Sequence, residues 1–236
     1  MRFTKFSFCL FVFLIALLDI SVFAQTSSSI PSPEWIEEHK DSLRKELLIN
    51  KKVPEKFEHS ILAALMHYPG LKSTRIKFKR TPISTTMAAR PTIWSIFRLR
   101  SKRKYVIAIN DEKNRRLAPL LKNTPFKARV GVIGHELGHI VDYNNKSSIT
   151  IVGNGAAYLF SKRFKRNLEY KIDSITITRN LGEGLLAFRK FIEEEAKTTR
   201  QYRAFKKDIY MSSSEIAQMV IEVNQGLSND RLDKED

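Results

Sequence analysis

The stretch Phe126–Tyr143 reads FKARVGVIGHELGHIVDY and predicts one helix, preceded by Thr124-Pro125, an N-cap residue and a proline suited to the first helical position. His135 and His139 are four positions apart, so on a helix both imidazoles lie on the same face and can reach one metal ion. Glu136, one position round from His135, would lie beside that ion and can accept a proton from water. The stretch therefore predicts a metal site with a general base.

The rest of this helix supplies packing surface. An apolar face opposite the histidines predicts a buried side, formed by Ile133, Leu137, Ile140 and Val141. Glycine in a helix costs roughly 1 kcal/mol relative to alanine, and three glycines recur here at helical spacing, Gly131, Gly134 and Gly138. Their cost suggests that another segment approaches the helix closely.

The alternative interpretation of the histidine pair is two buried histidines with ordinary hydrogen bonds. The chain has five histidines, and a chance HExxH match is expected well under ~1% of the time, which favours metal binding. The other three, His39, His59 and His67, fall in predicted N-terminal helices. We interpret them as surface or partly buried residues and not as ligands.

A catalytic zinc site needs three protein ligands and an open position. The HExxH motif followed by Glu169-Tyr170-Lys171-Ile172-Asp173 resembles the gluzincin group of zinc metallopeptidases, which includes thermolysin-like and HtpX-like enzymes. In that group a glutamate on a later helix completes the site, so the resemblance implies Glu169 as the third ligand. Asp173, four positions later, would then accept a proton from the far nitrogen of a ligating histidine.

Two other carboxylates compete for the ligand role. Asp142 follows His139 by only three positions and is interpreted as a surface residue or as a partner behind the ligands. Glu183, between two glycines, is the best remaining carboxylate. The metzincin pattern is not met, because it requires glycine where Asp142 stands and histidine or aspartate where Asn145 stands.

The resemblance implies an α+β, zincin-like fold with a small N-terminal β-sheet, an active-site helix and a mainly helical C-terminal half. It implies a zinc-dependent metalloendopeptidase in which Zn²⁺ activates water and Glu136 is the general base. A peptide or protein substrate would lie along an edge strand, for which Tyr105–Asn110 is the natural candidate, although its apolar run also suits a central strand. The residue that stabilises the oxyanion stays open among Arg179, Tyr202 and Tyr210.

Apolar spacing outlines the remaining elements. Helices are predicted at about 34–49 and 54–67, strands from Thr74 and over 83–89, and a hairpin or loop around 94–104. Further helices are predicted at about 148–160, 166–179, 183–197 and 213–224. Residues 34–67 either belong to the core or cover the cleft as an inhibitory segment.

The ends of the chain read as separate regions. Residues 1–24 have the layout of a cleavable signal peptide, and residues 25–33 are expected to form a flexible linker. The metallopeptidase domain is predicted over residues 34–228, followed by a disordered tail at 229–236. The expected location is therefore periplasmic or extracellular. The single cysteine, Cys9, lies in the signal, so a metal site must use histidine and carboxylate ligands.

The formal net charge of +16 favours an anionic partner. Because the chain is expected to be exported, nucleic acid is not expected, whereas an anionic envelope or membrane surface is a candidate. Trp94 and Phe97 beside the basic run Arg98–Lys104 would serve such a surface. The alternative function is thus a basic envelope- or membrane-surface-binding protein with a structural or inactive zinc site, and hydrolysis of a non-peptide amide is a further alternative. The oligomeric state is not readable.

Overall fold

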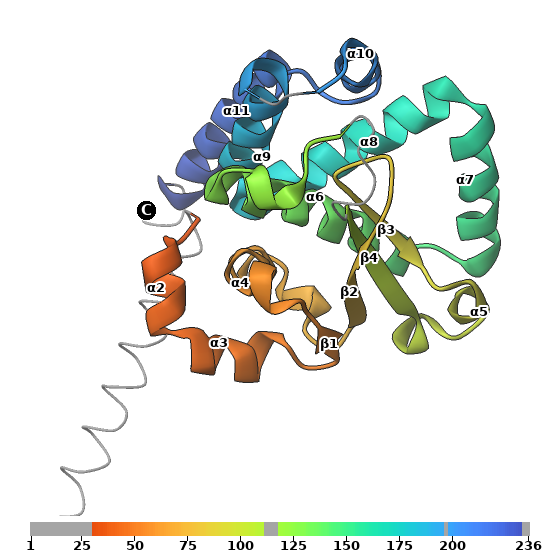
Figure 1. The fold of residues 1–236 in the computed structure, drawn as a ribbon, viewed down its shortest axis with the longest axis horizontal. Helices are drawn as coiled ribbons and strands as arrows, with labels where there is room; N and C mark the ends of the chain where they lie inside the picture. The colour runs from red at the N-terminus through yellow and green to blue at the C-terminus, as the bar shows by residue number, and fades with distance from the viewer. Residues whose placement is uncertain (1–29, 111–117, 196–197, 233–236) are drawn as a thin grey trace, which may run out of the picture.

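A small mixed sheet and a helical C-terminal half make up the protein, so the α+β class expected from the sequence is confirmed. The computed structural model describes residues 30–110, 118–195 and 198–232, and Figure 1 shows the sheet on one side of the long helices. The expected signal peptide, residues 1–24, lies outside the described residues. None of the helices in the described ranges has the length and apolar character needed to cross a bilayer.

The four strands are ordered β1-β2-β4-β3, with bounds Lys51–Lys52 for β1, Arg75–Thr81 for β2, Met87–Pro91 for β3 and Lys104–Asn110 for β4. Strand β4 pairs in parallel with β2 and antiparallel with β3. The prediction of an edge strand at Tyr105–Asn110 is therefore wrong, and the central position, which its apolar run also suited, is observed. Tyr105, Ile107 and Ile109 are buried on one face and Ala108 and Asn110 on the other, as a strand covered on both faces requires. Strand β3, which pairs only with β4, is an edge strand of the sheet.

Helix α6, Phe126–Asn144, runs through the centre of the fold. It begins after Pro125, which occupies the N-cap position that the sequence assigns to Thr124. Its burial is not confined to one face, because every residue from Val130 to Ile140 is buried. The predicted close approach is confirmed: a Cβ on Gly131 would lie 2.0 Å from the carbonyl carbon of Gly184.

The N-terminal helices are core elements. The predicted helix 34–49 is two helices, α2 Pro33–Glu38 and α3 Lys40–Leu47, which join at His39. Helix α4, Glu58–Met66, follows a short 3₁₀ turn at Glu55–Phe57 and is almost wholly buried. Tyr68, which precedes the 3₁₀ turn Pro69–Leu71, donates a hydrogen bond of 2.7 Å to the carbonyl oxygen of Gly134 on α6. Residues 34–67 thus support the central helix and do not form an inhibitory cover.

The structure also folds part of the expected linker. Ser32 caps α2 through its side chain, and Pro33 is the first helical residue. Ile30 packs against the hydrophobic core. The folded region therefore starts before residue 34.

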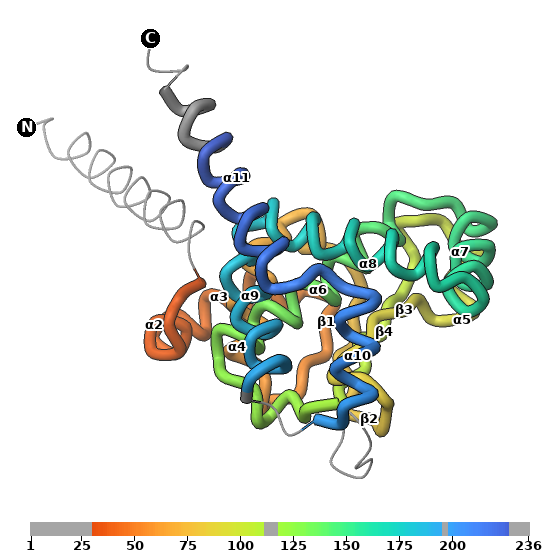
Figure 2. The backbone as a smooth tube through the Cα atoms, turned by 90° about the horizontal axis from the view of Figure 1, so that it is seen from above, coloured from red at the N-terminus to blue at the C-terminus, as the bar shows by residue number. Residues whose placement is uncertain are grey.

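The segment around 94–104 is neither a hairpin nor a simple loop. It contains helix α5, Ile93–Ile96, and a 3₁₀ turn, Arg100–Lys102. Helix α7, Ser148–Phe160, matches its predicted bounds and lies beside α5 at one end of the molecule (Figures 1 and 2).

The C-terminal helices follow the predicted order with one addition. Helix α8 spans Lys162–Thr176, a π-helical turn with a kink spans Ile177–Leu181, and α9 spans Gly182–Lys190 and continues as a π-turn, Phe191–Glu195. Helix α10, Arg200–Ile209, is not predicted from the sequence. Helix α11, Ser213–Leu232, extends into the expected disordered tail, whose last residues, 233–236, lie outside the described residues.

Candidate metal centre

The two histidines of the motif share one face of α6. Their ring centroids are 5.0 Å apart and the ring planes are inclined by 82°. Both side chains are buried. The helical spacing of His135 and His139 thus produces the predicted juxtaposition.

Glu169 on α8 completes the group. Its Oε2 atom lies 3.1 Å from Nε2 of His135 and 3.4 Å from Nε2 of His139. One ligand atom from each of the three residues lies within 4.8 Å of the other two. Two imidazole nitrogens and one carboxylate oxygen, all buried, form a donor set that can hold a metal ion.

Asp173, one turn after Glu169, lies behind the site. Its Oδ1 atom is 2.8 Å from Nδ1 of His135, while its Oδ2 accepts hydrogen bonds of 3.2 Å from Arg189 and from the backbone N–H of Met211. Because Nδ1 of His135 is engaged in this way, Nε2 is the nitrogen directed toward Glu169. The structure therefore places Asp173 where it can fix the orientation of the ring.

Tyr158 on α7 holds the other oxygen of Glu169. Its hydroxyl donates a hydrogen bond of 2.6 Å to Oε1. The sequence analysis misses Tyr158, Arg189 and Met211, since each comes from a separate element and no motif spacing links them to the histidines. Only the packing of α7, α9 and the segment between α10 and α11 against α8 brings them together.

The charges of the cluster are coupled. Burial opposes charge on His135, but its hydrogen bonds to Asp173 and Glu169 outweigh burial and raise the pKa of His135 to about 10. Burial likewise opposes ionisation of Glu169, yet the two histidines hold its pKa well below the usual range. The cluster thus favours an ionised carboxylate, the form that binds a metal.

Glu136 occupies the position expected of a base. It is buried, and its Oε2 atom has no hydrogen-bond partner among the described residues. A buried carboxylate oxygen without a partner costs free energy unless water or a ligand reaches it. Glu136 borders the same pocket as His139, Glu169 and Tyr210.

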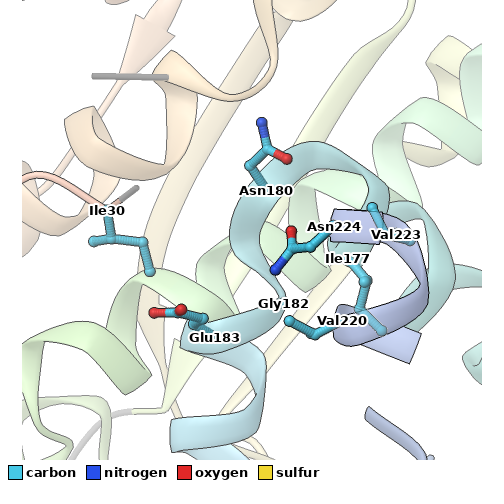
Figure 3. Close-up of a pocket in the computed structure, with 8 residues that line it drawn as sticks. All are labelled: Ile30, Ile177, Asn180, Gly182, Glu183, Val220, Val223 and Asn224. Carbon is cyan, nitrogen blue, oxygen red and sulfur yellow. The ribbon is translucent and has the colours of Figure 1, made fainter. Parts of the chain in front are cut away.

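This pocket has a volume of about 470 Å³, in the range of small-molecule or peptide sites. Strand β3 forms one wall through Met87 to Pro91, and α7 forms another. A separate hollow between the α8–α9 kink and α11 has a volume of only about 50 Å³ and shares no lining residue with it (Figure 3). The pocket at the histidines is distinguished by its lining and not by its volume, because it contains His139 and Glu169 of the convergent group together with Glu136.

The competing carboxylates are engaged elsewhere. Asp142 is buried, not on the surface, and accepts ion-pair contacts from Lys146 and Lys171. Glu183 is exposed and pairs with Lys127 at 2.5 Å. Neither belongs to the group of convergent ligand atoms.

The remaining histidines make local contacts. Nδ1 of His39 lies 2.9 Å from the carbonyl oxygen of Trp35, and His59 contacts Glu37. Nδ1 of His67 lies 2.9 Å from the carbonyl oxygen of Arg179. None of the three lies in the metal-binding group. His39 and His59 are partly buried as predicted, whereas His67 is buried, so its interpretation as a surface or partly buried residue is wrong.

Of the three candidates for oxyanion stabilisation, only Tyr210 lines the pocket with Glu136. Its ring lies 5.7 Å from that of His135, and Nζ of Lys206 lies 3.7 Å from its centroid. Arg179 lies over the ring of Tyr68, and Tyr202 lies outside the pocket lining.

Comparisons of the chain with protein-family models, with curated proteins and with solved structures returned no match. The functional argument therefore depends on the residues and their geometry.

Proposed function

We propose that this protein is a zinc-dependent metalloendopeptidase with a zincin-like fold, related to the gluzincin group. The observation that carries the proposal is the convergence of Glu169 on His135 and His139. The unpartnered Oε2 atom of Glu136 belongs to a residue that lines the same open pocket as His139 and Glu169. A purely structural metal site does not need an adjacent base.

His135, His139 and Glu169 would hold the metal. Two imidazoles and one carboxylate are a ligand set that catalytic zinc uses, and His135 would give up its proton when the metal binds. Zinc in this site would supply a Lewis acid that acidifies water. The hydrogen bond from Tyr158 and the contact with Asp173 keep Glu169 and His135 in place.

Glu136 would act as the proton carrier. Its carboxylate accepts a proton from the attacking water and returns the proton to the leaving amine. The reaction is hydrolysis of an amide bond.

Strand β3 would bind the substrate. It is an edge strand, pairs antiparallel with β4 only, and lines the pocket. An extended peptide can add to the free side of such a strand through backbone hydrogen bonds. Such pairing would favour extended peptides over isolated amides.

We further propose that residues 1–24 direct export and are removed. N-terminal sequencing of the protein recovered from the periplasm or medium should begin near Gln25.

The test combines metal content with hydrolysis of casein. Wild type is expected to hold about one zinc and to cleave casein. Glu136→Gln should keep the metal and lose cleavage, whereas Glu169→Ala should lose both. The matched control is Glu183→Gln, an exposed carboxylate outside the pocket, which should change neither. Absence of zinc in wild type, or full cleavage by Glu136→Gln, would contradict the proposal.

A further inference from the structure

We propose that one end of the molecule, formed by α5 and α7, docks onto an anionic lipid bilayer. We call this surface the apolar tip and define it by its exposed residues, Ile93, Trp94, Phe97, Leu99, Ile149, Val152, Leu159 and Phe160. These are eight of the eleven exposed large hydrophobic side chains in the described residues. Such a concentration differs from the scattered apolar residues of an ordinary surface.

Helix α7 is the first part of the argument. Its sequence, SITIVGNGAAYLF, contains no charged residue, although 28% of the chain is charged. Only Ile151 of its side chains is buried, and Ile149 and Phe160 are 86% and 89% exposed. An uncharged helix with so much exposed apolar surface gains stability if that surface leaves water.

Helix α5 adds an aromatic group next to α7. Trp94 is 84% exposed, and Phe97 is 71% exposed. The two helices are fixed together, because Ser148 donates a hydrogen bond of 2.5 Å to the carbonyl oxygen of Ile96. Arg103 reinforces the junction through bonds to the carbonyl oxygens of Tyr143 and Lys146. Both views show α5 and α7 side by side (Figures 1 and 2).

Charge identifies the partner. Residues 91–110 and 143–168, which carry the tip, contain ten lysines and arginines and no aspartate or glutamate. Two of these pair with carboxylates, Lys162 with Asp208 at 2.7 Å and Lys146 with Asp142 at 2.5 Å, and Arg103 is buried, which leaves seven basic residues. A second copy of the tip would bring like charges together, whereas an anionic bilayer offers both an apolar interior and a negative surface. The tip therefore fits a bilayer better than a copy of itself.

The opposite face of α7 borders the candidate active site. Ile151, Asn154, Gly155 and Tyr158 line the pocket, and Tyr158 bonds Glu169. Docking would place the pocket beside the membrane, which favours peptide segments close to a lipid surface. This consequence rests on the proposed function, whereas docking itself does not.

The test uses vesicles and a fluorescent reporter. The chain has two tryptophans, so Trp35→Phe leaves Trp94 as the sole reporter. The protein from Gln25 onward retains every described residue and removes the apolar segment 1–24, which would itself bind lipid. With vesicles of phosphatidylcholine and phosphatidylglycerol, we expect the protein to co-sediment and the emission of Trp94 to shift to the blue. Added salt should weaken this binding. The protein should bind less to vesicles of phosphatidylcholine alone.

Matched variants isolate the tip. Phe97→Ser with Phe160→Ser should weaken binding to the anionic vesicles at least about tenfold. Ile49→Ser with Ile221→Ser, two exposed apolar residues outside the tip, should bind as wild type. Glu136→Gln should also bind as wild type, so that failure of docking and failure of the peptidase mechanism are separable. Circular dichroism checks that each variant is folded.

Two outcomes would overturn the proposal. The first is equal binding by wild type and the tip variant, or no binding to anionic vesicles. The second is a dimer in solution that the tip variant converts to a monomer, which would make the surface a protein interface.

Discussion

Nδ1 of His135 lies 2.8 Å from Oδ1 of Asp173, and both side chains are buried. The aspartate is itself held from two sides, by Arg189 and by the backbone of Met211. A histidine anchored in this way presents Nε2 in a fixed direction, and Nε2 is the atom that faces Glu169. The contact therefore links α6 and α8 at the candidate metal centre.

Replacement of Asp173 should weaken metal binding without removing a ligand. We expect Asp173→Asn to lower zinc affinity by about 10- to 100-fold, because the ring loses its charged partner. Competition with a chromogenic chelator measures this change. Asp208→Asn, which removes an exposed carboxylate, is the control and should bind zinc as wild type. Equal affinities of Asp173→Asn and wild type would show that the contact does not orient the ligand.

The stability of the metal-free protein should contain a pH-dependent contribution from His135. Its pKa is raised from 6.5 to about 10 in the fold, so the folded state binds this proton more tightly than the unfolded state. The stabilisation is fully present below pH 6.5 and is lost as the pH rises through about 10.

Urea unfolding of the chelator-treated protein measures this contribution as the difference between wild type and His135→Gln. Lys206 is present in both proteins, so its effect cancels in this difference. Burial lowers the pKa of Lys206 to about 8, and its contribution to stability therefore rises with pH, opposite to that of His135. We expect the difference to shrink between neutral and alkaline pH. A difference that stays constant would mean that His135 is not protonated in the metal-free fold.

Tyr210 is the candidate for stabilising the oxyanion. Burial and the nearby Glu169 raise its pKa well above the ordinary value, so its hydroxyl stays protonated and can donate a hydrogen bond. Tyr210→Phe keeps the ring that packs near His135, and should lower kcat for casein cleavage by about 10²-fold with zinc content unchanged. Tyr202→Phe, outside the pocket lining, should cleave nearly as wild type; the reverse ranking would assign the role to Tyr202.

The sequence is informative where the site depends on spacing within one helix. His135 and His139 are predicted together because four residues make about one turn, and the same rule pairs Glu169 with Asp173. The sequence is not informative about contacts between separate elements. Tyr158 reaches Glu169 only because α7 packs beside α8, and no periodic pattern encodes that contact.

The position of β4 shows a second limit of the sequence. Its apolar run fits a strand buried on both faces, but whether Tyr105–Asn110 is an edge depends on where β3 pairs. That pairing depends on contacts between residues that are distant in the sequence. Helix α10 is not a limit of the same kind, because Tyr202, Phe205 and Ile209 recur at helical spacing within Arg200–Ile209. The pattern for this helix is present in the sequence, and the sequence analysis does not use it.

The contact between α6 and α9 should make Gly131 intolerant of any side chain. A Cβ there would lie 2.0 Å from the carbonyl carbon and 2.3 Å from the carbonyl oxygen of Gly184, and backbone atoms cannot rotate away. We expect Gly131→Ala to lower the free energy of unfolding by at least about 2 kcal/mol, even though alanine favours helices.

Gly153 on α7 is the matched control for Gly131, since it is also helical but its Cβ would meet no atom within 4 Å. Gly153→Ala should therefore raise the free energy of unfolding by about 0.4–1 kcal/mol. Alanine has the higher helix propensity and lowers the conformational entropy of the unfolded chain, and no contact is lost. Urea unfolding of both variants gives the comparison. If Gly131→Ala were as stable as Gly153→Ala, α6 and α9 would not pack closely, and Glu136 and His135 would lack the rigid support that a preorganised site requires.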